Sequence, residues 1–190
     1  MTGVQTCALP ILYSGGGQFI KHINHRQLNC PYDLSLGSDG HMLVCDWTDR
    51  NIKVLSPDGD NLLQSFIAPG CDSRPCCAVC HQDAFFVSYP HAHCVKVFNN
   101  AGVHQYDIGC EGSGDGQLSC PVGLVIDKFN QLIVCDNGNK RLQLFTLDGK
   151  FVTKITGQHL VDSSLSHVAV NKNGNVLVVD RNKNSIYVFH

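Results

Sequence analysis

Four short polar segments combine basic, histidine and aromatic residues that could bind an anionic or hydrogen-bonding partner. In chain order they read WTDRN, PHAHC, NGNKR and RNKNS. The candidate binding residues are Trp47, Arg50, His91, His93, Asn137, Lys140, Arg141, Arg181 and Lys183. Such cations can hold phosphates, and Trp47 or His91 could stack on an unpaired base or a partner side chain. The alternative is a solvated rim whose charge is offset by Asp46, Asp49, Asp136 and Asp180.

Three of these aspartates recur at one position of the pattern, where we predict a structural role. Asp46, Asp136 and Asp180 each end an apolar run just before a tight loop. A carboxylate in this place can accept backbone N–H bonds from the loop and fix the turn. Tyr89 replaces the aspartate in the second segment, which predicts that this loop is held differently.

A group of thiols and imidazoles around the second segment has residue types that bind zinc. Cys77 and Cys80 have the Cys-x-x-Cys spacing of zinc ligands. The nearby residues of the same kind are Cys76, His81, His91, His93 and Cys94. However, Cys77 and Cys80 fall on an expected strand, where residues three apart point to opposite faces and cannot readily reach one ion. We therefore predict no metal and no cofactor.

The sequence contains no enzyme signature. A Gly-x-Ser-x-Gly elbow, a Walker loop, a His-Glu-x-x-His pair and a Rossmann fingerprint are all absent from its 190 residues. We therefore expect a non-catalytic protein without catalytic residues.

An internal repeat positions the four segments. The run CPYDLSLGSDGHMLVCDWTDRNIKVLSPDG, which begins at Cys30, recurs as CPVGLVIDKFNQLIVCDNGNKRLQLFTLDG from Cys120. A degenerate copy covers 84–102, and a fourth covers 167–189. The residues that end the apolar runs lie 43, 47 and 44 positions apart by subtraction, a spacing typical of propeller blades.

Each copy supplies short strands and almost no helix signal. The second strands are apolar and rich in β-branched residues: MLVCD, QLIVCD and VLVVD. The third strands alternate in character and run into hairpin turns: IKVL, VKVF, LQLF and IYVF. The fourth strands are NLLQSF, VHQYDI and KFVTKI. The predicted fold class is an all-β propeller of four-stranded antiparallel blades.

Four blades are visible, with complementary segments at the two ends of the chain. The blades cover about 30–66, 75–108, 120–155 and 166–190. Residues 15–23 match a fourth strand, whereas the last copy has three strands. The segment 15–23 could close a ring on the last blade or belong to a preceding blade. A fragment of a six-bladed ring is the favoured interpretation, and a true four-bladed ring is the alternative. Residues 1–14 are interpreted as a non-native or disordered leader.

Residues 112–155 resemble an NHL repeat. They contain a Gly-Gln-hydrophobic linker, a Pro-x-Gly strand entry, a valine-rich strand ending in Asp, an Asn-Lys-Arg loop and an Asp-Gly turn. The resemblance extends over about 15–190, and the ending IYVF plus one residue is similar to tripartite-motif NHL proteins. It implies a platform for RNA stem-loops or protein partners, often in ubiquitin ligases whose RING domain this sequence does not contain. Lys140 and Arg141 match the family's basic loop.

Two alternatives to this RNA-binding or protein-binding platform remain open. The first is a protein scaffold that does not bind RNA. The second follows from the resemblance, because some six-bladed propellers with NHL-like repeats are lyases or lactonases that hold zinc or calcium in the channel. The inward-facing candidates for that chemistry are Asp33, His81, Asp127, His167 and Asn171.

Composition limits the classes of binding partner and the cellular compartment that we expect. Hydrophobic residues make up 43% and no apolar run of about 18 residues occurs, so we expect neither a membrane span nor a membrane partner. The net charge of -2 argues against non-specific nucleic-acid binding over the whole surface.

Eleven cysteines cannot all pair within the chain, which favours a cytoplasmic location. Two equivalent pairs, Cys30 with Cys120 and Cys45 with Cys135, are interpreted as packing residues. The expected partners are proteins or structured RNA, with no small-molecule substrate.

Overall fold

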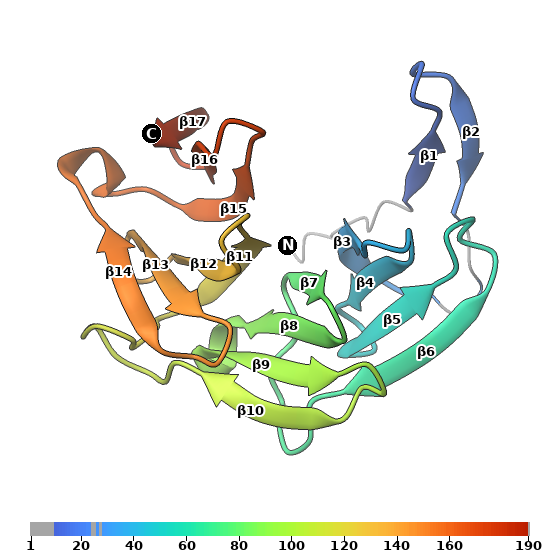
Figure 1. The fold of residues 1–190 in the computed structure, drawn as a ribbon, viewed down its shortest axis with the longest axis horizontal. Coiled ribbons are helices and arrows are strands. Elements are labelled where there is room, and N and C mark those ends of the chain that lie inside the picture. Colours follow the sequence, from blue (N-terminus) through green and yellow to red (C-terminus); the bar gives the residue numbers. More distant parts are fainter. Residues whose placement is uncertain (1–9, 24–25, 27, 190) are drawn as a thin grey trace, which may run out of the picture.

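The structure is a computed structural model that describes residues 10–23, 26 and 28–189. Its strands form antiparallel sheets that follow one another around a central axis (Figure 1). This arrangement confirms the predicted all-β propeller. Among the described residues, the helices are the 3-10 turns η1 (Pro90–Ala92) and η2 (Gln158–Leu160), and none has the length and apolar character that crossing a bilayer requires.

Four of the sheets are blades, and their strands run in chain order from the central axis outward. Blade 1 contains β3 (Pro31–Leu36), β4 (Met42–Asp46), β5 (Asn51–Leu55) and β6 (Leu62–Ile67). Blade 2 contains β7 (Ala78–His81), β8 (Ala84–Tyr89), β9 (Cys94–Asn99) and β10 (His104–Ile108). Blade 3 contains β11 (Pro121–Ile126), β12 (Gln131–Asp136), β13 (Arg141–Thr146) and β14 (Phe151–Ile155). The described strands of blade 4 are β15 (Leu165–Val170), β16 (Val176–Asp180) and β17 (Ser185–Phe189).

Apolar side chains fill the space between neighbouring blades. The ring centroid of Phe66 in blade 1 lies 5.3 Å from that of Phe85 and 5.0 Å from that of Phe98, both in blade 2. Similar cores lie between blades 2 and 3 and between blades 3 and 4. Because the strands bury their apolar faces against the next sheet, contacts between blades stabilise the arc.

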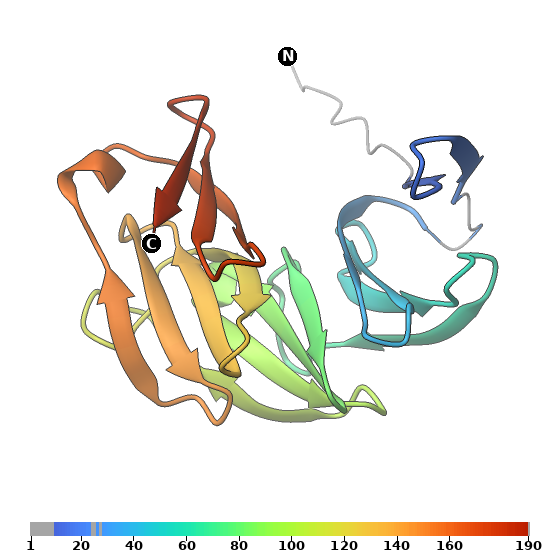
Figure 2. The ribbon, with the colours of Figure 1, turned by 45° about the horizontal axis from the view of Figure 1, so that its top comes forward.

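A short strand pair precedes blade 1. β1 (Ile11–Tyr13) pairs with β2 (Phe19–His22), and Leu12 and Ile23 pack with the apolar side chains on the adjoining side of blade 1. Figures 1 and 2 place this pair beside blade 1 and away from β17. The segment 15–23 thus takes the position of a preceding blade, and β2 does not pair with β17. Residues 11–13, which we assigned to the leader, form a strand, while residues 1–9 lie outside the described residues.

The strand register brings the four polar loops to one end of the propeller. Pro31 pairs with Asp46, Pro121 with Asp136 and Leu165 with Asp180, so the start of each first strand lies beside the end of the second strand. The loops 47–50, 90–93, 137–140 and 181–184 therefore share one end with the linkers between blades, as predicted. We call this end the loop face. The hairpin turns, such as 127–130 and 147–150, lie at the opposite end.

Most buried thiols are packing residues. Cys45 and Cys135 are fully buried at equivalent positions in β4 and β12. Cys77 packs in the core between blades 2 and 3, whereas Cys80 packs against the core between blades 1 and 2, so these two thiols diverge as predicted. Cys30 differs from the prediction, because it is disulfide-bonded rather than a packing thiol.

Candidate functional site

The three recurring aspartates hold the loop face together. The Asp46 carboxylate accepts N–H bonds from Asn29 at 2.8 Å and Cys30 at 3.1 Å in the preceding linker, and from Asp49 at 3.2 Å in its own loop. Asp136 and Asp180 accept equivalent bonds from Ser119 at 2.7 Å and Ser164 at 2.9 Å. The predicted turn-fixing role is confirmed for Asp46 and for Asp180, which accepts a loop N–H bond from Asn182. Asp136 instead accepts from the side-chain amide of Asn139 in its loop. The bonds to the linkers add a second anchoring point.

Burial and backbone hydrogen bonds shift the pKa of Asp180 in opposite directions. Burial would raise the pKa of Asp180, but N–H donors from Ser164, Asn182 and Lys183 bring it down to about 2. The aspartate is therefore charged at neutral pH, and its charge is already satisfied by donors within the fold.

A further donor stands seven residues after each aspartate. Lys53 Nζ lies 2.9 Å from Asp46 Oδ2, Gln143 Nε2 lies 3.1 Å from Asp136 Oδ2, and Tyr187 OH lies 3.3 Å from Asp180 Oδ2. This position is on the third strand, directly across from the second. The repeat therefore encodes a buried polar pair as well as an apolar core.

Arg141, predicted as a surface cation, belongs to this buried network. It is 5% exposed, and its Nε donates to Asp136 Oδ2 at 2.7 Å. Its Nη1 donates to the Ser113 carbonyl at 2.9 Å, and its Nη2 donates to the carbonyls of Gly114 at 2.7 Å and Gln117 at 2.8 Å. We correct its assignment to a structural residue that ties the linker between blades 2 and 3 to the third blade.

Two more of the predicted cations are engaged within the fold. Lys183 Nζ donates to the carbonyls of His159 at 2.9 Å and Val161 at 2.7 Å. Arg50 lies 3.4 Å from the Asp72 carboxylate. Lys140 and Arg181 have no acidic partner within ion-pair distance among the described residues. The loop face therefore does not carry a continuous basic ring.

Both faces of the Trp47 ring are occupied. Its ring stacks on Tyr32, with centroids 4.6 Å apart and planes 7° apart, and the Arg74 guanidinium lies 5.1 Å from the ring centroid. Because the stacked tyrosine fills one face, the guanidinium covers the other. The predicted stacking of Trp47 on a base or a partner side chain has no free ring face in this structure.

The remaining predicted residues differ in accessibility. The His91 side chain is exposed, and its backbone N–H donates to Ser73 Oγ at 3.2 Å. His93 Nδ1 accepts from the Cys120 N–H at 3.2 Å and so connects the second blade to the third. Asn137 Oδ1 is buried without a hydrogen-bond partner in the described part of the chain. Among these three, His91 is the one whose side chain is presented to solvent.

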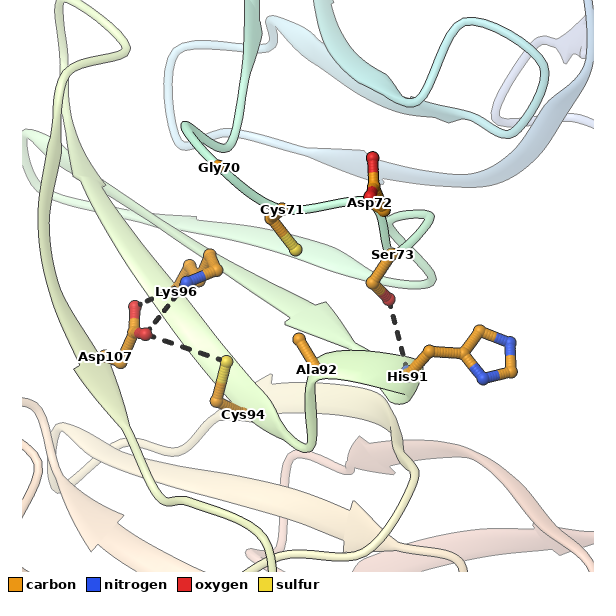
Figure 3. A pocket seen from close by; sticks show the side chains of 9 residues that line it. All are labelled: Gly70, Cys71, Asp72, Ser73, His91, Ala92, Cys94, Lys96 and Asp107. Carbon is orange, nitrogen blue, oxygen red and sulfur yellow. Dashed lines mark hydrogen bonds and ion pairs between the residues drawn. The ribbon is translucent and has the colours of Figure 1, made fainter.

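The second blade, which has Tyr89 in place of the aspartate, is held differently, as predicted. Its Lys96 pairs with Asp107 in the fourth strand at 2.8 Å. Burial opposes the charged form of Lys96, but the hydrogen bond that Lys96 donates to Asp107 raises its pKa. Beside this pair lies a cavity of about 430 Å³, which His91, Cys71 and Cys94 help to line (Figure 3).

Tyr89 itself is fully buried, and its hydroxyl has no hydrogen-bond partner among the described residues. We expect Tyr89→Phe to keep or raise the free energy of unfolding, by up to about 1 kcal/mol, because it removes an unpaired buried polar group. Urea denaturation of both proteins measures the difference. A loss above about 1 kcal/mol would mean that the hydroxyl has a partner after all.

The channel candidates do not converge on one site. His167 Nε2 in blade 4 lies 3.5 Å from Asp33 Oδ1 in blade 1, so these two side chains meet across the channel. Asp127 and Asn171 instead accept backbone N–H bonds in turns at the opposite end. His81 closes the first strand of blade 2 at that same end. No group of three potential metal ligands occurs in the part of the chain that the structure describes.

The channel ion pair should make stability depend on pH. The hydrogen bond to Asp33 raises the pKa of His167, whereas burial and Arg181 lower it. A raised pKa in the folded state means that the stabilisation is complete below the unfolded value of about 6.5 and is lost as pH rises through the folded value. Since His167 is half-exposed, we expect less than about 1 kcal/mol. Urea denaturation from acidic to mildly alkaline pH should show this loss, and His167→Gln should abolish it.

Two residues that the sequence did not single out complete the centre of the loop face. Tyr32 and Arg74 surround Trp47, and Arg181 of blade 4 reaches Tyr32, where it lowers the tyrosine pKa against the larger effect of burial. We call Tyr32, Trp47, Arg74 and Arg181 the arginine–aromatic cluster. No motif identifies it, because its members come from three different blades or linkers.

The sequence is similar to a known repeat family and to parts of known proteins. The family model described as NHL repeat matches residues 118–145. Protein lin-41 of Caenorhabditis elegans is 48% identical over 46 residues, which cover 24% of this chain and 4% of lin-41. The human E3 ubiquitin-protein ligase TRIM32 is 30% identical over 95 residues, which cover 43% of this chain and 14% of TRIM32. The chain thus spans a small part of either relative.

Solved structures share the fold. A streptogramin B lyase structure superposes with a TM-score of 0.67 at 15% sequence identity, over 83% of this chain and 50% of the lyase chain. At this identity the likeness supports the propeller fold alone.

Proposed function

Because the chain is an NHL-repeat β-propeller with partial similarity to tripartite-motif NHL proteins, we propose that it is a non-catalytic recognition module for a protein partner. The proposed binding surface is the loop face, where loops and linkers from all four blades meet. These segments present side chains without interrupting the strands that hold the blades together. Propellers with such a rigid scaffold place adaptable residues in loops.

We favour a protein partner over RNA because several of the predicted cations are already bound by groups within the fold. Arg141 and Lys183 donate to carbonyls of the fold, and Arg50 pairs with an acid. RNA binding depends on several cations that neutralise phosphates, and on aromatic faces that stack on bases. The loop face has few free cations, and Trp47 is covered, which supports a protein partner over RNA.

The wider role we propose is substrate recognition within a tripartite-motif ubiquitin ligase in the cytoplasm. The 95-residue similarity to TRIM32, a protein named as an E3 ubiquitin-protein ligase, supports this role. Ligase chemistry would come from a RING domain, and the propeller would select the protein to be modified.

Two charge reversals in the same blade test the binding surface. Lys140 lies on the loop face, whereas Lys128 is exposed in the β11–β12 turn at the opposite end. Proteins captured on the immobilised chain after ribonuclease treatment would be purified and titrated against Lys140→Glu and Lys128→Glu. We expect Lys140→Glu to weaken binding roughly ten-fold and Lys128→Glu to change it less than about two-fold.

Two results would overturn the proposal. Equal weakening by both variants would place the interface away from the loop face. If ribonuclease abolished the capture and the affinity for RNA fell steeply with salt, the partner would be RNA rather than a protein.

A further inference from the structure

We propose that the arginine–aromatic cluster is an anion subsite that takes a carboxylate from an acidic peptide segment of the partner. This inference rests on the proposed function, since it names the chemistry that one part of the loop face recognises. Its members are Tyr32, Trp47, Arg74 and Arg181.

Two guanidinium groups of the cluster lack a carboxylate partner. Arg50 pairs with Asp72 and Arg141 pairs with Asp136. Arg74 and Arg181, in contrast, are exposed and form no ion pair with any described residue. A guanidinium offers parallel N–H donors that match the two oxygens of a carboxylate. The fold therefore leaves both guanidinium groups of the cluster without a carboxylate partner among the described residues.

The Arg74 side chain and the Arg181 backbone are held in position before any ligand binds. The Arg74 guanidinium rests on the Trp47 ring at 5.1 Å, and Trp47 is fixed by its stacking on Tyr32. The Arg181 side chain lies close enough to Tyr32 to affect its pKa, and its backbone N–H donates to the Ser164 carbonyl at 2.9 Å. Preorganised donors lose less conformational entropy when a ligand binds.

The members of the cluster come from separate parts of the propeller. Tyr32 and Trp47 belong to blade 1, Arg74 lies in the linker that enters blade 2, and Arg181 follows β16 in blade 4. The subsite consequently exists only when the blades are assembled around the axis. A partner that binds there would contact several blades at once, so its binding would require the assembled propeller.

The charge of the site favours a carboxylate over a nucleic acid. Two free guanidinium groups can balance one or two negative charges, whereas an RNA segment carries a phosphate at each nucleotide. Trp47 also offers no free face for a base. A short acidic peptide segment satisfies both conditions.

The test uses the full chain and a fluorescent hexaglutamate peptide with blocked ends, titrated in a low-salt buffer. Arg74→Gln and Arg181→Gln should each weaken binding roughly ten-fold, the loss expected for a charge-assisted hydrogen bond. The matched control is Arg50→Gln, an exposed arginine of the same face that already has an acidic partner, with an expected change below about two-fold. Circular dichroism and thermal unfolding verify that each variant folds.

Three outcomes would overturn the inference: no binding of hexaglutamate, equal binding by all variants, or tighter binding of an oligouridine of equal charge. None of these outcomes affects the test of the loop face with Lys140→Glu. If a protein partner depends on Lys140 while hexaglutamate fails to bind, the proposed function stands and the acidic subsite is rejected.

Discussion

Arg141→Ala is expected to lower the free energy of unfolding by about 3–5 kcal/mol, the cost of breaking a buried ion pair. The substitution leaves the Asp136 carboxylate, which is fully buried, without its 2.7 Å ion-pair partner. It also removes the donors to the carbonyls of Ser113, Gly114 and Gln117. The linker between blades 2 and 3 therefore loses these three attachments to β13 and keeps those that Gln143 makes to Gly116 and Gln117.

Urea denaturation measures this loss, and Lys140→Ala is the matched control. Lys140 precedes Arg141 directly and forms no ion pair with a described residue, so its change should stay within about 0.5 kcal/mol. If both variants lost the same small amount, Arg141 would be a surface cation after all, and the original sequence-based assignment would be restored.

Gly123→Ala is expected to cost at least about 2 kcal/mol, because overpacking between two backbones cannot be relieved by a side-chain rotation. A Cβ at this position would lie 2.7 Å from His167 Cα and 2.8 Å from the Ser166 carbonyl oxygen in blade 4. Blades 3 and 4 would have to move apart, which would open the core between them.

Gly15→Ala is the control for this prediction, since no heavy atom lies within 4 Å of the added Cβ. Its free energy of unfolding should match that of the unmodified protein within about 0.5 kcal/mol. Amide hydrogen exchange provides a second measurement, because the Gly123→Ala variant should lose protection in β15 first. Unchanged stability of Gly123→Ala would show that the two inner strands are farther apart than described.

The repeat made the blades predictable from the sequence. Apolar runs ending in Asp46, Asp136 and Asp180 mark the second strands, and the antiparallel register follows from the hairpin turns. The position of the four loops at one end follows from the same register. Short-range pattern therefore determines each blade, since the contacts involved lie within one repeat.

The roles of individual charged residues were less predictable. Arg141 reads as part of a basic loop, yet its partners are carbonyls 24 to 28 residues earlier in the linker. Counting charges in a loop does not show which of them are used by the fold. The same limit applies to Lys183, whose acceptors lie in another linker.

The arginine–aromatic cluster could not be found from the sequence for a related reason. Tyr32 and Arg181 are separated by most of the chain and meet because blades 1 and 4 both border the channel. Such a meeting depends on the curvature of the arc, which the repeat period does not specify. For residues 11–13, a short strand was missed because the segment resembled an artificial leader.

Hydrogen–deuterium exchange of the chain, alone and bound to a captured protein partner, would locate the surface that binds the partner. Recognition through the loop face predicts added protection in the loops 47–50, 137–140 and 181–184 and in the linker 70–75. The turns 127–130 and 147–150 at the opposite end should exchange at unchanged rates. Protection confined to those turns, or to the outer strands of the blades, would show that the partner does not bind the loop face.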